Sequence, residues 1–130
     1  MRIMLFGTFD HLHPGHLSVL REAGLRGEDV TVVVARDKNV ERMKGKPPEQ
    51  GEDERMAAIR LVFPSFDVRI GDDADFLAPV RSVRPDLILL GYDQMLPPGV
   101  TEADLGATVE RLHAFEPKRY KSSLRRTLLK

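Results

Sequence analysis

The feature that most constrains the fold is the segment Val30–Ala35 (VTVVVA), which is β-branched almost throughout. β-branched residues favour strands, and an apolar run without polar alternation predicts a strand that is buried on both faces. Such strands belong to parallel sheets, because the helices that connect parallel strands cover both faces. Arg2–Phe6 (RIMLF) and Asp86–Leu90 (DLILL) each stop at a glycine, and we expect them to be further buried strands.

Helical patterns alternate with these strands. This alternation predicts an α/β fold: an open parallel sheet of about five strands with helices on both faces, in a single domain over residues 1–130. Thr101 is expected to cap a helix that runs towards His113, and Ser122 or Ser123 to cap a short helix that ends at Leu129. The other expected elements are helices at His16–Ala23, Asp53–Phe63 and Phe76–Val83, a short strand at Asp67–Ile70 and a mobile loop at Pro47–Glu54.

Charge and composition exclude several classes of function. The 20 basic and 20 acidic residues balance, so the chain as a whole has no electrostatic attraction to nucleic acid or to an anionic membrane. The absence of cysteine removes disulfides, thiolate zinc sites and cysteine nucleophiles. No apolar run approaches the roughly 18 residues of a membrane-spanning helix. We therefore expect a soluble, cytoplasmic protein with no nucleic-acid and no membrane partner.

The segment after the first strand has the composition of a phosphate site. Ligands of open parallel sheets bind beyond the carboxyl ends of the strands. The first strand ends at Gly7-Thr8-Phe9-Asp10, and the next helix is expected to start near Gly15, so its free N–H groups and positive dipole end suit a phosphate. Neither a Walker loop nor a GxGxxG fingerprint occurs in the sequence.

Three of the four histidines, His11, His13 and His16, fall in this segment. Pro14-Gly15 separates His13 from His16, so both rings are expected to face the ligand at the helix N-terminus. Imidazoles beside an α-phosphate can donate hydrogen bonds to the charge that develops on its oxygens. A zinc site is the alternative, but it needs further ligands and only His11 and Asp10 are near in sequence. We therefore predict no metal held by the protein itself.

Residues 7–16 (GTFDHLHPGH) resemble the GTFD-x-x-HxGH signature of the cytidylyltransferase-like nucleotidyltransferases. This group includes glycerol-3-phosphate cytidylyltransferase, phosphopantetheine adenylyltransferase and the archaeal-type FAD synthases. The resemblance implies a Rossmann-like sheet and a transition-state role for His13 and His16, and it gives His11 no catalytic role. It also implies that the nucleotide is bound by Gly7, Thr8, Phe9, Asp10, His13, Gly15 and His16.

Three further segments match the family. Lys44 and Lys46, with Arg55, correspond to residues that meet the phosphate of the acceptor, and Lys44 is also expected to assist catalysis; a solvated basic loop is the alternative. Gly91 and Asp93 correspond to a loop near the ribose and base. Tyr120, Ser122 and Ser123 correspond to a clamp on the β- and γ-phosphates, in a C-terminal stretch that could instead be a solvated helix face.

The words VARD, LGYDQ and YKSS are most similar to archaeal-type FAD synthases. The resemblance therefore implies an FMN adenylyltransferase, which converts ATP and FMN to FAD and pyrophosphate. A cytidylyltransferase that uses CTP and glycerol 3-phosphate is the first alternative, and a non-catalytic nucleotide or flavin sensor is the second. The resemblance also implies a divalent ion, Mg²⁺, held by the triphosphate oxygens, and a homodimer by analogy with relatives.

Overall fold

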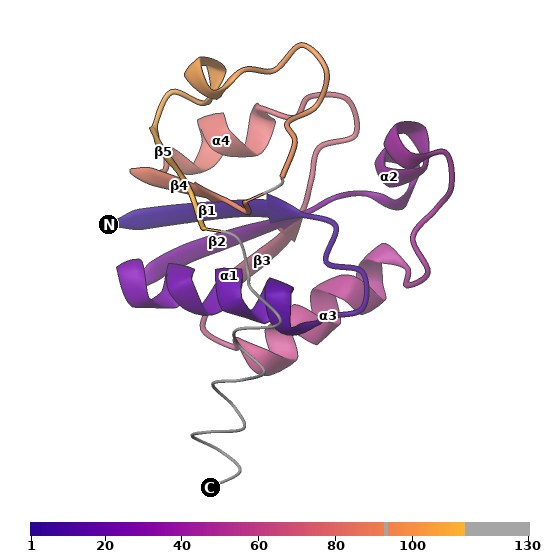
Figure 1. Cartoon of the computed structure of the whole chain (residues 1–130), viewed down its shortest axis with the longest axis horizontal. Coiled ribbons are helices and arrows are strands. Elements are labelled where there is room, and N and C mark those ends of the chain that lie inside the picture. Colours follow the sequence, from indigo (N-terminus) through magenta and orange to yellow (C-terminus); the bar gives the residue numbers. More distant parts are fainter. Residues whose placement is uncertain (93, 114–130) are drawn as a thin grey trace, which may run out of the picture.

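The computed structural model describes residues 1–92 and 94–113. Over these residues the chain alternates between strands and helices, as the sequence predicts (Figure 1). In chain order the elements are β1 (Arg2–Gly7), α1 (Pro14–Arg26), β2 (Asp29–Val34), α2 (Asp37–Lys44), α3 (Glu52–Val62), β3 (Asp67–Ile70), α4 (Ala78–Val83), β4 (Leu87–Leu90), the 3₁₀ helix η1 (Glu102–Leu105) and β5 (Thr108–Arg111).

The five strands form one sheet in the order β3-β2-β1-β4-β5, and every neighbouring pair is parallel. The chain first winds outward from β1 through β2 to β3 and then restarts on the other side of β1 with β4 and β5. The direction of winding therefore reverses between β1 and β4. In open α/β sheets this switch point is where a crevice for ligands forms, beyond the carboxyl ends of the strands.

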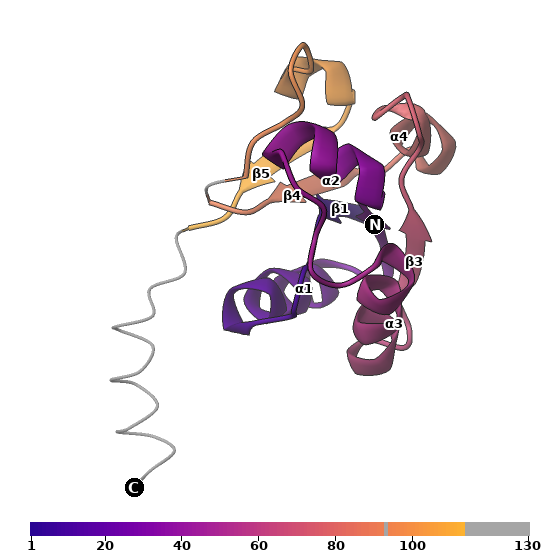
Figure 2. The same cartoon turned by 90° about the vertical axis from the view of Figure 1, so that its right-hand side faces the viewer.

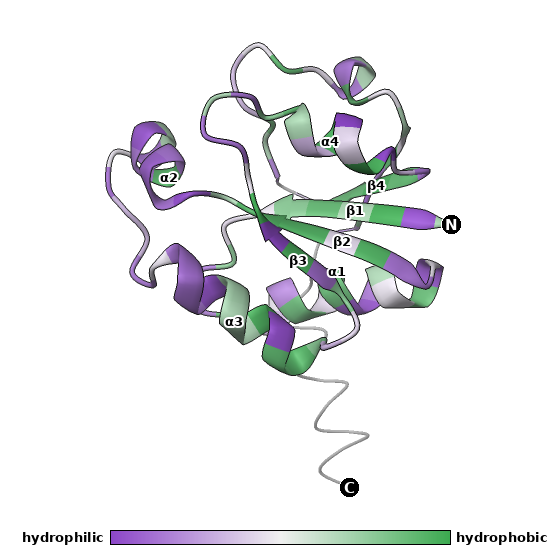
Figure 3. Ribbon diagram, turned by 180° about the vertical axis from the view of Figure 1, so that it is seen from behind, coloured by the Kyte–Doolittle hydropathy of each residue, from purple (hydrophilic) through white to green (hydrophobic). Residues whose placement is uncertain are grey.

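Helices cover both faces of the sheet, which confirms the predicted architecture. Alternate residues of β1 point to opposite faces, so Ile3 and Leu5 pack in the core beneath α1 and α3, whereas Met4 and Phe6 pack beneath α4 and η1. Figure 2, seen along the strands, separates these two layers, and Figure 3 shows the apolar strands between them. Within the described residues, none of the helices is long and apolar enough to cross a membrane.

The helix α2 has no counterpart among the predicted elements. Only Val40 of this helix is buried, and Figure 3 colours most of the helix as hydrophilic, so it lacks the apolar stripe by which a helix is found in a sequence. It is held by polar contacts instead: the Asn39 side chain donates a hydrogen bond to the Asp72 carbonyl over 3.1 Å. The helix ends at Gly45, whose φ of 82° is a left-handed conformation that glycine adopts without strain.

The predicted helix from Thr101 towards His113 is wrong. Thr101 does cap a helix, but η1 has four residues and ends at Gly106, whose φ is 64°. The chain then forms β5, which pairs with β4 from Thr108 to Arg111. Local propensity did not decide the structure of this segment. Pairing with β5 satisfies the backbone groups on the edge of β4, which would stay open if residues 108–111 continued the helix. The predicted helix that ends at Leu129 lies outside the described residues.

Candidate active site

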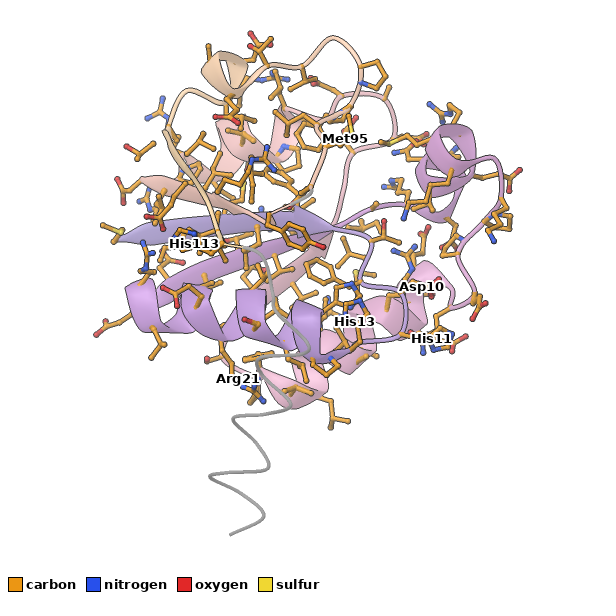
Figure 4. The ribbon with its side chains drawn as sticks, viewed as in Figure 1. Asp10, His11, His13, Arg21, Met95 and His113 are labelled. Carbon is orange, nitrogen blue, oxygen red and sulfur yellow. The ribbon has the colours of Figure 1, made fainter. Side chains whose placement is uncertain are left out.

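The candidate site lies beyond the carboxyl ends of β1 and β4, at the switch point of the sheet. The loop after β1 leads into α1, and the loop after β4 begins at Gly91. Figure 4 places Asp10, His11 and His13 together here, between the start of α1 and the end of the molecule that carries α2. The structure thus brings the histidine-rich segment to the position where ligands of this fold bind.

His13 and His16 cap the first turn of α1 reciprocally. His13 is the N-cap, and its Nδ1 accepts hydrogen bonds from the Gly15 amide at 3.1 Å and the His16 amide at 3.4 Å. In return, Nδ1 of His16 accepts from the His13 amide at 3.4 Å. Pro14 occupies the first helical position, where its missing N–H costs nothing. Because of this cap, α1 begins at Pro14 rather than at the predicted His16.

The cap corrects one expectation and explains a chemical property. The amides of Gly15 and His16 are already bonded to His13, so they are not free to bind a phosphate as the sequence suggested. The two imidazoles can donate hydrogen bonds in their place. Since both Nδ1 atoms accept from the backbone, each neutral ring carries its proton on Nε2, on the side away from the cap. The rings stack with their centroids 3.6 Å apart, so the two Nε2–H donors are held side by side.

His16 is neutral at physiological pH. Burial, together with the nearby His13 and Lys44, lowers the pKa of His16 to about 4, although Asp10 acts in the opposite direction. The ring also meets the edge of Phe9, with centroids 5.5 Å apart. A neutral imidazole with its proton on Nε2 donates a hydrogen bond without first losing a proton.

Gly7 and Phe9 shape the loop through packing. The Phe9 ring is buried and folds back over Gly7, where a Cβ atom would lie 2.7 Å from a ring carbon. Only glycine therefore fits at position 7 without displacing the ring. Phe9 itself has a φ of 55°, a left-handed conformation that is unusual for a bulky residue. The packing of Phe9 on Gly7 thus fixes the shape of the loop after β1, in which Thr8 is half-buried.

Asp10 ties this loop to the segment that precedes α3. Its carboxylate accepts the amides of Glu49 at 2.8 Å and Gln50 at 2.9 Å, and the His11 amide donates to the Gln50 side chain at 2.9 Å. Burial raises the pKa of Asp10, but hydrogen bonds from these two amides and the nearby positive charges outweigh it and lower the pKa below its usual value. The predicted mobile loop at Pro47–Glu54 is therefore held at Glu49 and Gln50, and its last three residues already belong to α3, which begins at Glu52.

Arg55 is fully buried and joins three segments of the site. Its Nε donates to the Gln50 carbonyl at 3.0 Å, one Nη donates to the Thr8 carbonyl at 2.8 Å, and the other pairs with Asp37 at 2.6 Å. This placement does not fit the expectation that Arg55 touches the acceptor, because no part of the side chain reaches solvent. Arg55 instead holds these three segments together through its hydrogen bonds. An arginine on the apolar face of α3, beside Met56 and Ile59, is the sequence signal that indicates this role.

Lys44 and Lys46 flank the end of α2 and are both exposed. Lys44 lies near enough to His16 to lower its pKa, so it shares the electrostatic environment of the site. Gly91 begins the loop after β4, and its amide and carbonyl are bonded to Gln94 and Arg111. Sequence reasoning missed both of these partners. Asp93, Tyr120, Ser122 and Ser123 lie outside the described residues.

No group of three or more histidine and carboxylate side chains with the geometry of a metal site occurs within residues 1–92 and 94–113. Within that part of the chain, Asp10 is committed to the amides of Glu49 and Gln50. His13 and His16 direct their Nδ1 atoms at the backbone. The donor set therefore matches an anion better than a cation.

A parallel sheet with a histidine-capped helix at its switch point places the chain among the α/β proteins whose ligands bind beyond the carboxyl ends of the strands. The family model described as cytidylyltransferase-like matches residues 4–119. The chain therefore belongs to the cytidylyltransferase-like family, and the membership that residues 7–16 predicted is confirmed. The Rossmann-like fold is confirmed with it.

The chain is also similar to individual members of this family and to solved structures. The chain is 41% identical over 120 residues to the FAD synthase of Methanosphaerula palustris, an alignment that spans 88% of this chain and 76% of that protein. It is 38% identical over 130 residues to the FAD synthase of Archaeoglobus profundus, spanning 95% and 81%. Among solved structures, a protein of Thermoplasma volcanium described as a lipopolysaccharide core biosynthesis protein has a TM-score of 0.77 and 34% identity, spanning 89% of this chain and 98% of that one.

The low pKa of His16 makes the stability of the fold depend on pH. An unfolded histidine has a pKa of roughly 6.5, above the value of about 4 in the folded chain. Protons therefore bind the unfolded state first, so the stabilisation is complete above pH 6.5 and is lost as the pH falls towards 4. We predict that the Tm of the wild type falls more steeply over this interval than that of His16→Asn, measured by thermal unfolding. A Tm difference that is the same at every pH would contradict this.

Removal of the buried guanidinium should destabilise the protein strongly. Arg55→Met leaves Asp37 and the carbonyls of Thr8 and Gln50 without their partner, and loss of one member of a buried charged network costs about 3–5 kcal/mol. The measurement is chemical denaturation. Arg21→Met, at an exposed position on α1, is the matched control and is expected to change the free energy of unfolding by less than about 0.5 kcal/mol. Equal effects of the two substitutions would show that Arg55 holds nothing together.

Proposed function

We propose that this protein is an FAD synthase, which transfers AMP from ATP to the phosphate of FMN and releases pyrophosphate. The observation that carries the reaction class is the pair of Nε2–H donors that His13 and His16 present at the switch point of the sheet. The choice of ATP and FMN is supported by the similarity to two FAD synthases over most of the chain.

The reaction needs no covalent enzyme intermediate. A phosphate oxygen of FMN attacks the α-phosphorus of ATP in line, a new P–O bond forms, and the bond to the oxygen that bridges the α- and β-phosphates breaks. Pyrophosphate leaves with that oxygen and its electron pair. Negative charge moves to the nonbridging and leaving oxygens, where fixed hydrogen-bond donors stabilise the transition state.

The two histidines act as these donors. Their Nδ1 atoms are held by the helix cap, so the rings cannot turn away from the site without breaking the start of α1. Neutral His16 donates through Nε2 with no competing charged form near pH 7. Because the donors are oriented before the substrate arrives, little reorganisation is needed during the reaction.

The remaining contacts are assigned from the resemblance of these segments to the family. We assign the phosphate of FMN to Lys44 and Lys46, two exposed, flexible charged side chains at the end of α2, of which Lys44 lies near enough to His16 to lower its pKa. We assign the ribose and base to Gly91 and Asp93, and the β- and γ-phosphates to Tyr120, Ser122 and Ser123. The Mg²⁺ ion enters as part of the nucleotide substrate, bound mainly to triphosphate oxygens and water.

A substrate screen tests the proposal. The purified protein is incubated with ATP or CTP and with FMN or glycerol 3-phosphate, and pyrophosphate release is measured in all four combinations. We expect turnover with ATP and FMN, with FAD identified as the product. Turnover only with CTP and glycerol 3-phosphate would identify a cytidylyltransferase instead, and nucleotide binding without turnover in any combination would indicate a sensor.

The role of the Nε2–H donor is tested separately. His16→Asn keeps an acceptor near the position of Nδ1 for the cap but removes the donor at Nε2. We predict that kcat falls at least about a hundredfold while the Kd for ATP stays within several-fold, as expected of a group that acts mainly in the transition state. His11→Asn is the matched control, since the His11 ring is exposed and pairs with Glu49, and its kcat should stay near that of the wild type. Equal loss of kcat and affinity in His16→Asn would refute the catalytic role.

A further inference from the structure

The parallel ladder between β1 and β4 stops before the strands end. Paired positions run from Ile3 opposite Leu87 to Leu5 opposite Leu89. Beyond them, the two strands part at the switch point, and the Phe6 carbonyl of β1 and the Gly91 amide after β4 face the gap. A backbone donor and acceptor left open at this place would weaken the connection between β1 and the end of β4.

The side chain of Gln94 closes this gap. Its Nε2 donates to the Phe6 carbonyl at 2.8 Å, and its Oε1 accepts from the Gly91 amide at 3.0 Å. The side-chain amide thus makes one bond to each strand end, with the same donor and acceptor that a peptide group would provide. It continues the connection between β1 and β4 by one step across the point where they separate.

The loop that carries Gln94 is itself held from the edge of the sheet. The backbone N–H of Gln94 donates a hydrogen bond to the Gly91 carbonyl at 3.1 Å, which closes a tight turn. Arg111, the last residue of β5, donates to the carbonyls of Gly91 at 2.9 Å and Gln94 at 2.7 Å. The turn therefore has its backbone fixed to β5 by Arg111 and its side chain fixed to β1.

These bonds determine the distance between the two halves of the site. Phe6 precedes the Gly7–Asp10 loop that leads to His13 and His16, whereas Gly91 begins the loop after β4. A nucleotide with its α-phosphate at the histidines and its base and ribose at the loop after β4 has to reach from one loop to the other. Its fit depends on how far apart β1 and β4 are held.

We propose that Gln94 is a positioning residue that holds the loop after β4 against β1 and thereby sets the affinity of the site for the base and ribose of the nucleotide. The inference rests on the proposed function, because it assumes that a nucleotide binds at the loops after β1 and β4. It assigns no contact with the substrate to the Gln94 side chain, which is half-buried and occupied by Phe6 and Gly91.

The geometry requires an amide, because one end must donate and the other must accept. Gln94→Leu has a similar size but makes neither hydrogen bond. Gln94→Glu as a carboxylate keeps an acceptor for the Gly91 amide but sets a second oxygen against the Phe6 carbonyl. When protonated, the same side chain has a hydroxyl that donates to Phe6. Its activity should therefore recover as the pH falls, which a general loss of stability would not reproduce.

The experiment compares the wild type, Gln94→Leu and Gln94→Glu in ATP titrations with FMN between pH 5 and pH 8. We expect Gln94→Leu to raise the KM for ATP about tenfold or more at every pH, as the loss of two hydrogen bonds implies. The KM of Gln94→Glu should be raised similarly at pH 8 and approach the wild-type value at pH 5. Each variant is compared with the wild type at the same pH, so the effects of Arg111, Glu102 and His16, which all variants share, cancel.

Two controls keep a failure interpretable. Tripolyphosphate, which lacks base and ribose, should inhibit Gln94→Leu as strongly as the wild type, and this also shows that the variant is folded. Met95→Leu, at an exposed neighbouring position, should leave the KM for ATP unchanged. A KM near that of the wild type in Gln94→Leu, or a pH-independent ratio between Gln94→Glu and the wild type, would overturn the inference.

The same variants separate this inference from the proposed function. Binding of ATP and CTP, measured by calorimetry, does not require an acceptor. A wild type that binds a nucleotide but does not use FMN contradicts the proposed function, and weaker nucleotide binding by Gln94→Leu then still supports the role of Gln94. Turnover with FMN together with unchanged nucleotide binding in Gln94→Leu refutes the role of Gln94 alone.

Discussion

The reciprocal hydrogen bonds between His13 and His16 start α1 and orient the reactive groups at the same time. A cap that used serine or aspartate would satisfy the same amides but would present nothing further to a substrate. An imidazole has a second nitrogen, so binding the helix through Nδ1 leaves Nε2 pointing away with its proton. The capping geometry also explains the spacing of the two histidines, because a capping box joins the N-cap to the third helical residue.

The cap is supported from behind by contacts that are not catalytic. Arg55 lies buried beneath the loop and bonds to Thr8, Gln50 and Asp37, while Asp10 holds the amides of Glu49 and Gln50. These groups belong to segments that are far apart in the sequence. A buried guanidinium is tolerated only where such partners satisfy it, so the network fixes the relative positions of the loops that it joins. We infer that catalysis by positioning depends on this network, because the donors must be in place before the substrate binds.

Much of the fold could be predicted from the chain. The run from Val30 to Ala35 indicated a strand buried on both faces, and β2 is that strand. The elements that were missed or wrong are those with weak local signals. The helix α2 has one buried residue and is held by polar contacts to a distant loop, and β5 forms because β4 offers an open edge. Local patterns do not contain either contact, since both partners come from elsewhere in the sequence.

The sequence by itself predicted the reaction class, through the resemblance of residues 7–16 to a nucleotidyltransferase signature, and the spacing of His13 and His16 has a direct local consequence in the capping box. It also determined the layered architecture through the apolar strands. Only the tertiary structure decided which polar residues support the site and which are exposed to substrate. Arg55 was expected at the acceptor but is enclosed, and Gln94 was assigned no role but joins β1 to β4. The physical reason is that a long polar side chain can be either a ligand contact or a buried connector, and its distant partners decide between the two.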